Sequence, residues 1–326
     1  MTRAGSTTIG VLGKAPWRDE YLRIGVEGEP FASFDTWLTD NVEWAVVHAP
    51  PGFAEAYRTG SARAFVFRPT GTTAPVLAGA IVPSHDGAGR NFPLIVAAPF
   101  ADQAEALAST PELLPIVLED FWQLANDLAV AVQNAGGVDV AGRVASVTPP
   151  PMPSASEASA TYVAWTNTMP LTDLFALVYG DADGRGAAQA VQMILETVRP
   201  YRDIDRPRTL LTLRLPLGAS GGAAVCFWID LIRRATHWKT TIPSLFWSHD
   251  GASGDMLLHL GDAPRSTLAE LWMPTAARAE FCDLTAPLRA EQLAALPAAP
   301  AELLRLFDGT DHRVLELVET VASARW

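Results

Sequence analysis

Three features common in larger proteins are scarce or missing in this sequence. Only two cysteines, Cys226 and Cys282, occur in 326 residues, so a disulfide framework is not expected and a reducing compartment fits. No stretch of 18 uncharged apolar residues occurs, and the N-terminal residues lack the apolar core of a signal peptide. These absences predict a cytoplasmic protein with no membrane insertion.

Positive charge is also in short supply. The chain has 24 Lys and Arg against 36 Asp and Glu, which gives a formal net charge of -12. A nucleic-acid-binding protein needs a basic surface to replace the counterions around phosphates, and docking on an anionic membrane needs one too. The charge balance therefore argues against both partners and leaves basic proteins open as partners.

The familiar sequence motifs for cofactors and metals are missing. The string GVLGK at residues 10–14 has neither the spacing nor the hydroxyl residue of a phosphate-binding loop, and no HExxH or CxxC occurs. The densest set of possible metal ligands is His237, His249, Asp250 and His259, for which dispersed surface positions are the simpler interpretation. We therefore expect no bound metal, nucleotide or other cofactor.

One short string invites a catalytic interpretation. Ser84, His85 and Asp86 are consecutive, and a nucleophile, a base and an acid are the groups that acyl transfer needs. Side chains of neighbouring residues point apart, however, and Ser and Asp are typical turn residues because they bond nearby backbone amides. An uncharacterised hydrolase or phosphatase is the alternative function, and it requires these three side chains to converge in a pocket.

What the chain does have is enough apolar residues for a large core and enough length for two domains. The hydrophobic fraction is 49% and the charged fraction 18%. Prolines and small residues dominate 149–160, a composition that favours an extended linker. We accordingly predict an N-terminal domain over 1–146, a Pro/Ser/Ala-rich linker over 147–160 and a C-terminal domain over 161–326.

Hydrophobic periodicity predicts short strands and amphipathic helices in both halves. Apolar residues at helical spacing follow Phe34, and the runs at 76–82 and 93–100 are typical of buried strands. In the second half, a helix is predicted over 221–238, followed by a hairpin formed by 244–248 and 256–260. The fold class is therefore α+β or mixed α/β, with two domains that are each a small sheet packed by helices.

Two strings in the first half resemble a known family. The string GVLGKAPWRDEY at 10–21, followed by FDTWL at 34–38, is similar to the opening of the TagF (ImpM) family, G-x-x-G-K-L-P-x-R-G-D-F and then D-x-W-L. The string PSHDGAGRNFPL at 83–94 matches the family pattern P-S-x-D-x-x-G-R-x-F-P-L. The family Gly-Asp pair is Asp19–Glu20 here, which shifts its carboxylate by one methylene. The candidate interaction or structural residues that the resemblance singles out are Lys14, Pro16, Arg18, Glu20, Trp37, Ser84, Asp86, Gly89, Arg90 and Phe92.

The resemblance implies an accessory protein of the bacterial type VI secretion system. Members of the family act as post-translational repressors through protein contacts, notably with a forkhead-associated-domain scaffold protein. In some relatives the domain is fused to a PP2C-type phosphatase, whose aspartate motifs are missing from this sequence. The expected function is therefore non-enzymatic, with protein components of the secretion system as partners. A structural adaptor, in which the two domains pack into one platform, is a third interpretation.

The spacing of the motif residues also predicts their arrangement. Arg18 and Glu20 follow the first strand, and Asp86 and Arg90 lie in the Gly-rich turn between two later strands. Because sheets gather such connections at their strand ends, we expect the four side chains to lie close together. Arg90 then either contacts a partner or pairs with Asp86 or Glu20 to brace the turn, and the sequence leaves this choice open.

Overall fold

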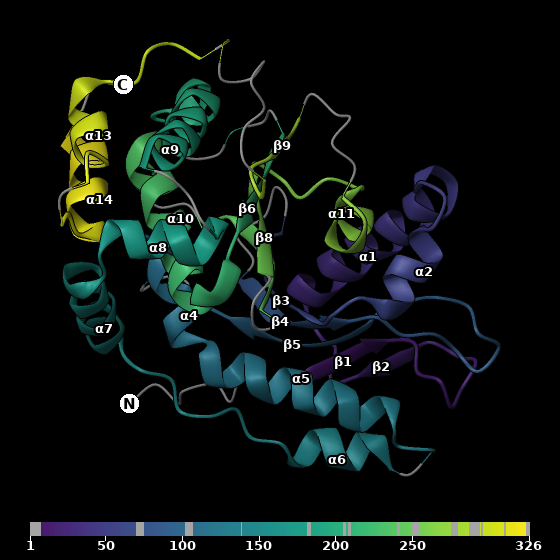
Figure 1. Ribbon diagram of the computed structural model, residues 1–326. Helices are drawn as coiled ribbons and strands as arrows, with labels where there is room; N and C mark the ends of the chain where they lie inside the picture. Colours follow the sequence, from purple (N-terminus) through teal and green to yellow (C-terminus); the bar gives the residue numbers. More distant parts are fainter. Residues whose placement is uncertain are drawn as a thin grey trace.

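A single sheet of nine described strands runs through both halves of the chain (Figure 1). In this computed structural model, the strand order is β2-β1-β5-β4-β3-β7-β8-β6-β9, and only β6 and β9 pair in parallel. The residues described are 8–323, apart from 70–74, 102–106, 138, 181–183, 205–206, 208–209, 240–241, 250–253, 275–279, 287–293, 295 and 310. The strands are β1 (Gly10–Gly13), β2 (Leu22–Ile24), β3 (Arg63–Phe67), β4 (Val76–Val82), β5 (Leu94–Phe100), β6 (Leu211–Pro216), β7 (Ser244–His249), β8 (Gly254–Leu260) and β9 (Phe281–Asp283).

The strands of the N-terminal half form because their residues are apolar on both faces. All seven residues of β4 are buried, as are six of the seven in β5. A continuous apolar run of this kind suits a strand covered on both sides by helices. In β1, Gly13 has φ +118, and a Cβ there would stand 2.1 Å from the Pro93 carbonyl oxygen, so only glycine fits this pairing.

The two halves join through β3 and β7. These strands pair antiparallel, with Ala64 opposite Trp247 and Phe65 opposite Phe246. The rings of Phe65 and Phe246 lie 5.9 Å apart between centroids. The hydrogen-bond ladder therefore crosses without a break from the first half of the sequence into the second.

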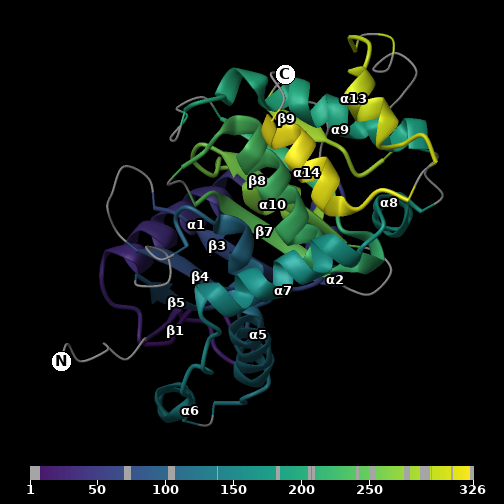
Figure 2. The same ribbon diagram turned by 90° about the vertical axis from the view of Figure 1, so that its left-hand side faces the viewer.

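Helices cover both faces of the sheet. One face packs on α1 and its neighbours α2 and α11, and the other on α5 and on the helices around α10. Figure 2 shows α7 and α14 lying against α10 on that second side. The helices are α1 (Glu29–His48), α2 (Phe53–Thr59), η1 (Pro111–Leu113), α4 (Leu114–Val117), α5 (Glu119–Gln133), α6 (Val140–Ser146), α7 (Ala155–Thr168), α8 (Leu171–Tyr179), α9 (Gly184–Val198), η2 (Arg199–Tyr201), η3 (Gly218–Ser220), α10 (Gly222–Thr236), α11 (Thr267–Trp272), α13 (Ala301–Arg305) and α14 (Val314–Ser323).

The predicted mixed α and β class is confirmed. The two predicted small sheets, however, are joined edge to edge into one, because β3 presents an open edge that β7 completes.

The prediction that residues 149–160 are extended is wrong for residues 155–160, which belong to α7. Ser154 caps that helix by accepting a hydrogen bond from the Glu157 amide, and the Glu157 carboxylate accepts one from the Ser154 amide in return. This capping box overrides the effect of the prolines from residue 154 onward.

Candidate functional site

The turn between β4 and β5 is organised around the buried carboxylate of Asp86. The Asp86 amide donates to the Arg90 carbonyl at 3.1 Å, and the Gly89 amide donates to the Asp86 carbonyl at 2.9 Å. The Asp86 Oδ1 atom accepts the Arg90 and Ala88 amides at 2.8 and 3.1 Å. Gly89 has φ +80, which glycine adopts without strain. The turn therefore folds around its own carboxylate.

Two cations complete the Asp86 site. Lys14 Nζ lies 2.8 Å from Asp86 Oδ2, and Arg90 Nε lies 2.6 Å from the same atom. Lys14 also donates to the Asp19 carbonyl at 3.0 Å. The bond from Lys14, reinforced by those from Arg90, holds the pKa of the Asp86 carboxyl well below its usual range, against the opposing effect of burial. Asp86 is thus a fixed anion that ties the β1 end to the β4–β5 turn.

Exposure separates the members of this site. The Asp86 side chain is fully buried and that of Lys14 is 17% exposed, whereas that of Arg90 is 67% exposed. Arg90 uses Nε on Asp86, and no described residue accepts from its two terminal nitrogens. Its guanidinium therefore lies at the surface, with Nε held by Asp86 and the two terminal nitrogens facing away from that carboxylate.

The four charged residues expected to gather form two neighbouring pairs. Arg18 Nε lies 3.2 Å from Glu20 Oε2, and both side chains are exposed. This pair reaches the turn through the backbone, because the Gly87 amide donates to the Arg18 carbonyl at 3.0 Å. Arg90 pairs with Asp86 and not with Glu20. Of the two carboxylates considered as bracing partners of Arg90, Asp86 is therefore the one it contacts.

The other motif residues contribute to packing. Pro16 is half-buried beside the same turn, and Phe92 packs edge-on against Tyr21, with ring centroids 5.3 Å apart. Trp37 lies elsewhere, on α1, where its ring stacks on Phe246 and its indole nitrogen donates to the Ala263 carbonyl at 3.0 Å. Trp37 therefore helps to hold the two halves together and lies outside the Asp86 site.

Ser84, His85 and Asp86 do not form a catalytic relay. The Ser84 hydroxyl is buried without a hydrogen-bond partner among the described residues, and Tyr57 bonds only the Ser84 backbone. His85 Nδ1 faces the Asp86 carbonyl oxygen at 2.7 Å, and the Asp86 carboxylate is occupied by Lys14 and Arg90. The three side chains thus point to different surroundings.

The surface position expected for the histidines considered as metal ligands is wrong for His259. His259 is fully buried in β8, with Nδ1 2.9 Å from the Thr212 hydroxyl, and His237 pairs with Asp203 at the end of α10. Asp250 lies outside the described residues. Over the described part of the chain, no three His, Cys, Asp or Glu side chains are grouped to hold a metal ion.

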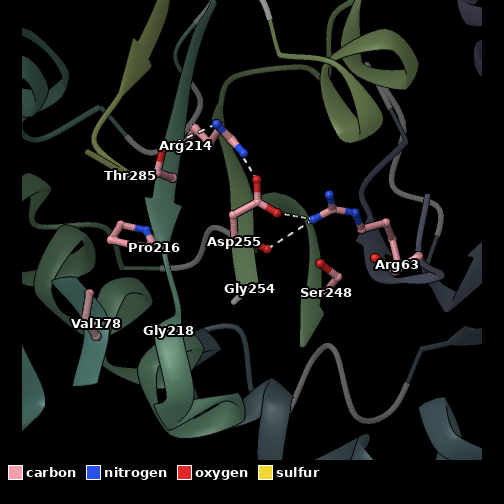
Figure 3. A pocket seen from close by; sticks show the side chains of 10 residues that line it. Arg63, Val178, Arg214, Pro216, Gly218, Ser248, Gly254, Asp255 and Thr285 are labelled. Carbon is pink, nitrogen blue, oxygen red and sulfur yellow. Dashed lines mark hydrogen bonds and ion pairs between the residues drawn. The ribbon is translucent and has the colours of Figure 1, made fainter. Parts of the chain in front are cut away.

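A second cluster of charges, which no sequence motif indicated, lies at the junction of the two halves. In Figure 3, Arg63 from β3 and Arg214 from β6 approach Asp255 of β8 from opposite sides. Arg214 Nε lies 2.5 Å from Asp255 Oδ2, and Arg214 Nη1 lies 3.0 Å from Asp283 on β9. Arg63 also donates to the Leu271 carbonyl at 2.5 Å. Charged residues within otherwise apolar strands were the available signal.

Among the helices described, none is both long and apolar enough to cross a bilayer. Residues 10–141 match the family of TagF N-terminal domains, described as type VI secretion system-associated, and this range contains all ten motif residues. No curated protein matches the sequence. The crystal structure of PA0076 from Pseudomonas aeruginosa PAO1 is similar, with 17% identity and a TM-score of 0.48 over 83% of this chain and 96% of that one. At that identity and score, the likeness carries no functional argument.

Proposed function

We propose that this chain is a non-enzymatic accessory protein that acts by binding other proteins of the type VI secretion system. The proposal rests on the match of residues 10–141 to the type VI secretion-associated TagF N-terminal domain. The proposed activity is post-translational repression through contact with a forkhead-associated-domain scaffold protein. Both finer points rest on what the family resemblance implies.

The exposed guanidinium of Arg90 is the observation that supports this proposal best. Its side chain is 67% exposed, while its Nε is fixed by a carboxylate that is itself fully buried. A pre-oriented arginine loses little conformational entropy when it binds a carboxylate or carbonyl, and arginines of this kind are common anchors of protein interfaces. The turn therefore presents Arg90 as a ready contact for an acidic group on a partner.

The same geometry weakens the case for a hydrolase or phosphatase. A nucleophile needs a base within hydrogen-bond reach, and the Ser84 hydroxyl has no such partner among the described residues. Asp86 is held as an anion by two cations and two amides, so it is a poor proton acceptor. Nothing in this arrangement favours the enzymatic alternative.

The test is to replace Arg90 and to measure binding and folding separately. In Arg90→Ala, Asp86 keeps Lys14 and both backbone amides, so the melting temperature should change little. Affinity for the purified forkhead-associated-domain protein, measured by calorimetry, should fall by about ten-fold or more, as for an interface anchor. Arg90→Lys should recover only part of it, because a lysine cannot reproduce the planar fork.

Arg58→Ala on α2 is the matched control, since that side chain is 58% exposed and bonds only within its own helix, to Glu55 and the Ala54 carbonyl. It should leave affinity unchanged. If Arg90→Ala binds like the wild type and still represses secretion in cells, Arg90 is not the contact. If the wild-type protein itself does not bind the scaffold protein, the proposed partner is wrong.

A further inference from the structure

Two adjoining cavities lie where the two halves of the chain meet. The first has a volume of about 380 Å³ and is lined in part by Arg214, Asp255 and Gly218. The second, of about 370 Å³, is lined in part by Gly222 at the start of α10. Ser61, Arg63 and Ser248 line both, so the two form one continuous cleft. Clefts between packed units of a chain are common places for ligands.

Buried positive charge exceeds buried negative charge around this cleft. The side chains of Arg63 and Arg214 are 9% and 21% exposed, and both bond the single carboxylate of Asp255, which is 11% exposed. The second carboxylate, Asp283, pairs with Arg214 and also accepts hydrogen bonds from the Thr285 amide and hydroxyl; it is 26% exposed, so water screens its charge more. Glu119 also lines the second cavity, but its side chain is exposed, so water screens its charge. Among the buried groups the positive charge is in excess, which favours an additional anion in the inner part of the cleft.

Hydrogen-bond donors are also in surplus there. Ser248 is 7% exposed, and its hydroxyl has no partner among the described residues; Figure 3 shows it beside Arg63 and Asp255, facing the cavity. Arg63 Nε is buried without an acceptor, and no described residue accepts from Arg214 Nη2. Arg63 Nε, enclosed without an acceptor, costs free energy, whereas the Ser248 hydroxyl and Arg214 Nη2 are not fully enclosed and can donate to a ligand that supplies acceptor oxygens.

The start of α10 adds a third favourable element. The helix has 15 residues, and no side chain caps its N-terminus. Gly222 is its first residue, lines the second cavity and has nothing within 4 Å of the position where a Cβ would stand. The free amides and the dipole of a helix N-terminus attract anions.

We propose that this cleft binds a small molecule that carries a phosphate or carboxylate group, with its oxygens against Ser248, Arg214 and the amide end of α10. Most residues that line the first cavity come from the C-terminal half, whereas most of those that line the second, from β3, β4, α4 and α5, lie within residues 10–141. The proposal does not depend on the protein contact proposed for Arg90, so failure of one test leaves the other proposal unaffected.

The experiment is a calorimetric titration of the full chain with inorganic phosphate and, separately, with succinate, at constant ionic strength. The wild type should bind at least one of them saturably, and the tighter of the two identifies the favoured group. Gly222→Asp should abolish binding by repulsion, while an acidic residue in the first turn keeps α10 stable. Gly222→Asn has nearly the same volume without the charge and should bind more tightly than Gly222→Asp.

A second pair of variants tests the hydroxyl. Ser248→Ala should weaken binding by about ten-fold, the loss expected for one hydrogen bond to a charged group. Ser84→Ala removes another buried hydroxyl, distant in the sequence and outside both cavities, and should bind like the wild type. Absence of saturable binding of either anion by the wild type, or unchanged binding by Gly222→Asp, would overturn the proposal. Equal loss in both Gly222 variants would contradict the argument from charge repulsion at the start of α10.

Discussion

Replacing Asp255 by Asn should strongly destabilise the protein. The Asp255 carboxylate is 11% exposed and serves two guanidinium groups at once, one from each half of the chain. Asn keeps the size of the side chain but removes its charge, so Arg63 and Arg214 lose their shared counter-ion in a buried setting. Leaving a buried charge without its partner costs about 3–5 kcal/mol.

Urea unfolding followed by tryptophan fluorescence measures this loss as a lower midpoint at unchanged slope. The control is Asp40→Asn, whose partner Arg265 is 73% exposed; this pair should contribute about 0–1 kcal/mol. In the double variant Asp255→Asn/Arg63→Gln, the loss should be smaller than the sum of the two single losses, because both remove one interaction. Equal midpoints for Asp255→Asn and Asp40→Asn would refute the reasoning.

Two further predictions follow from the sheet and its core. Because the β3–β7 ladder makes one sheet of both halves, urea should unfold the chain in a single transition; two separate transitions, by fluorescence and by circular dichroism, would contradict this. Burial lowers the pKa of His259 to about 3, below its ordinary value near 6.5, so the unfolded state binds the extra proton between these values. The contribution of His259 to the free energy of unfolding should therefore be complete above pH 6.5 and decrease towards pH 3, by at most about 1.4 kcal/mol per pH unit. In His259→Phe, the free energy of unfolding should depend less on pH over this range.

Local elements were predictable from the sequence because neighbouring residues determine them. The apolar run at 93–100 contains β5, the helical spacing after Phe34 lies within α1, and the predicted hairpin is β7 paired with β8. The pairing of β3 with β7 was not predictable, since it joins residues about 180 positions apart. The apolar pattern of each strand is equally compatible with pairing to several other strands. The start of α7 was predictable: Ser154 and Glu157 have capping-box spacing, which the prolines before them obscured.

In the candidate site, too, contacts within one turn were predictable and contacts between distant segments were not. Contact between Asp86 and Arg90 follows from their separation of four residues in one turn. Contact between Lys14 and Asp86, 72 residues apart, depends on β1 pairing beside β5, which no local pattern specifies. The pairing of Arg63 with Asp255 spans 192 residues and depends on the same long-range assembly of the sheet.

The junction of β3 and β7 also bears on the synthesis of the chain. The N-terminal strands leave the ribosome first, and β3 then presents an open row of amides and carbonyls until β7 emerges about 180 residues later. At roughly 5–20 residues per second, this interval lasts on the order of ten seconds or more. During that time the nascent chain exposes a strand edge that a second nascent chain can pair with. Folding on crowded polysomes should therefore depend more on chaperones than refolding of the complete protein at low concentration.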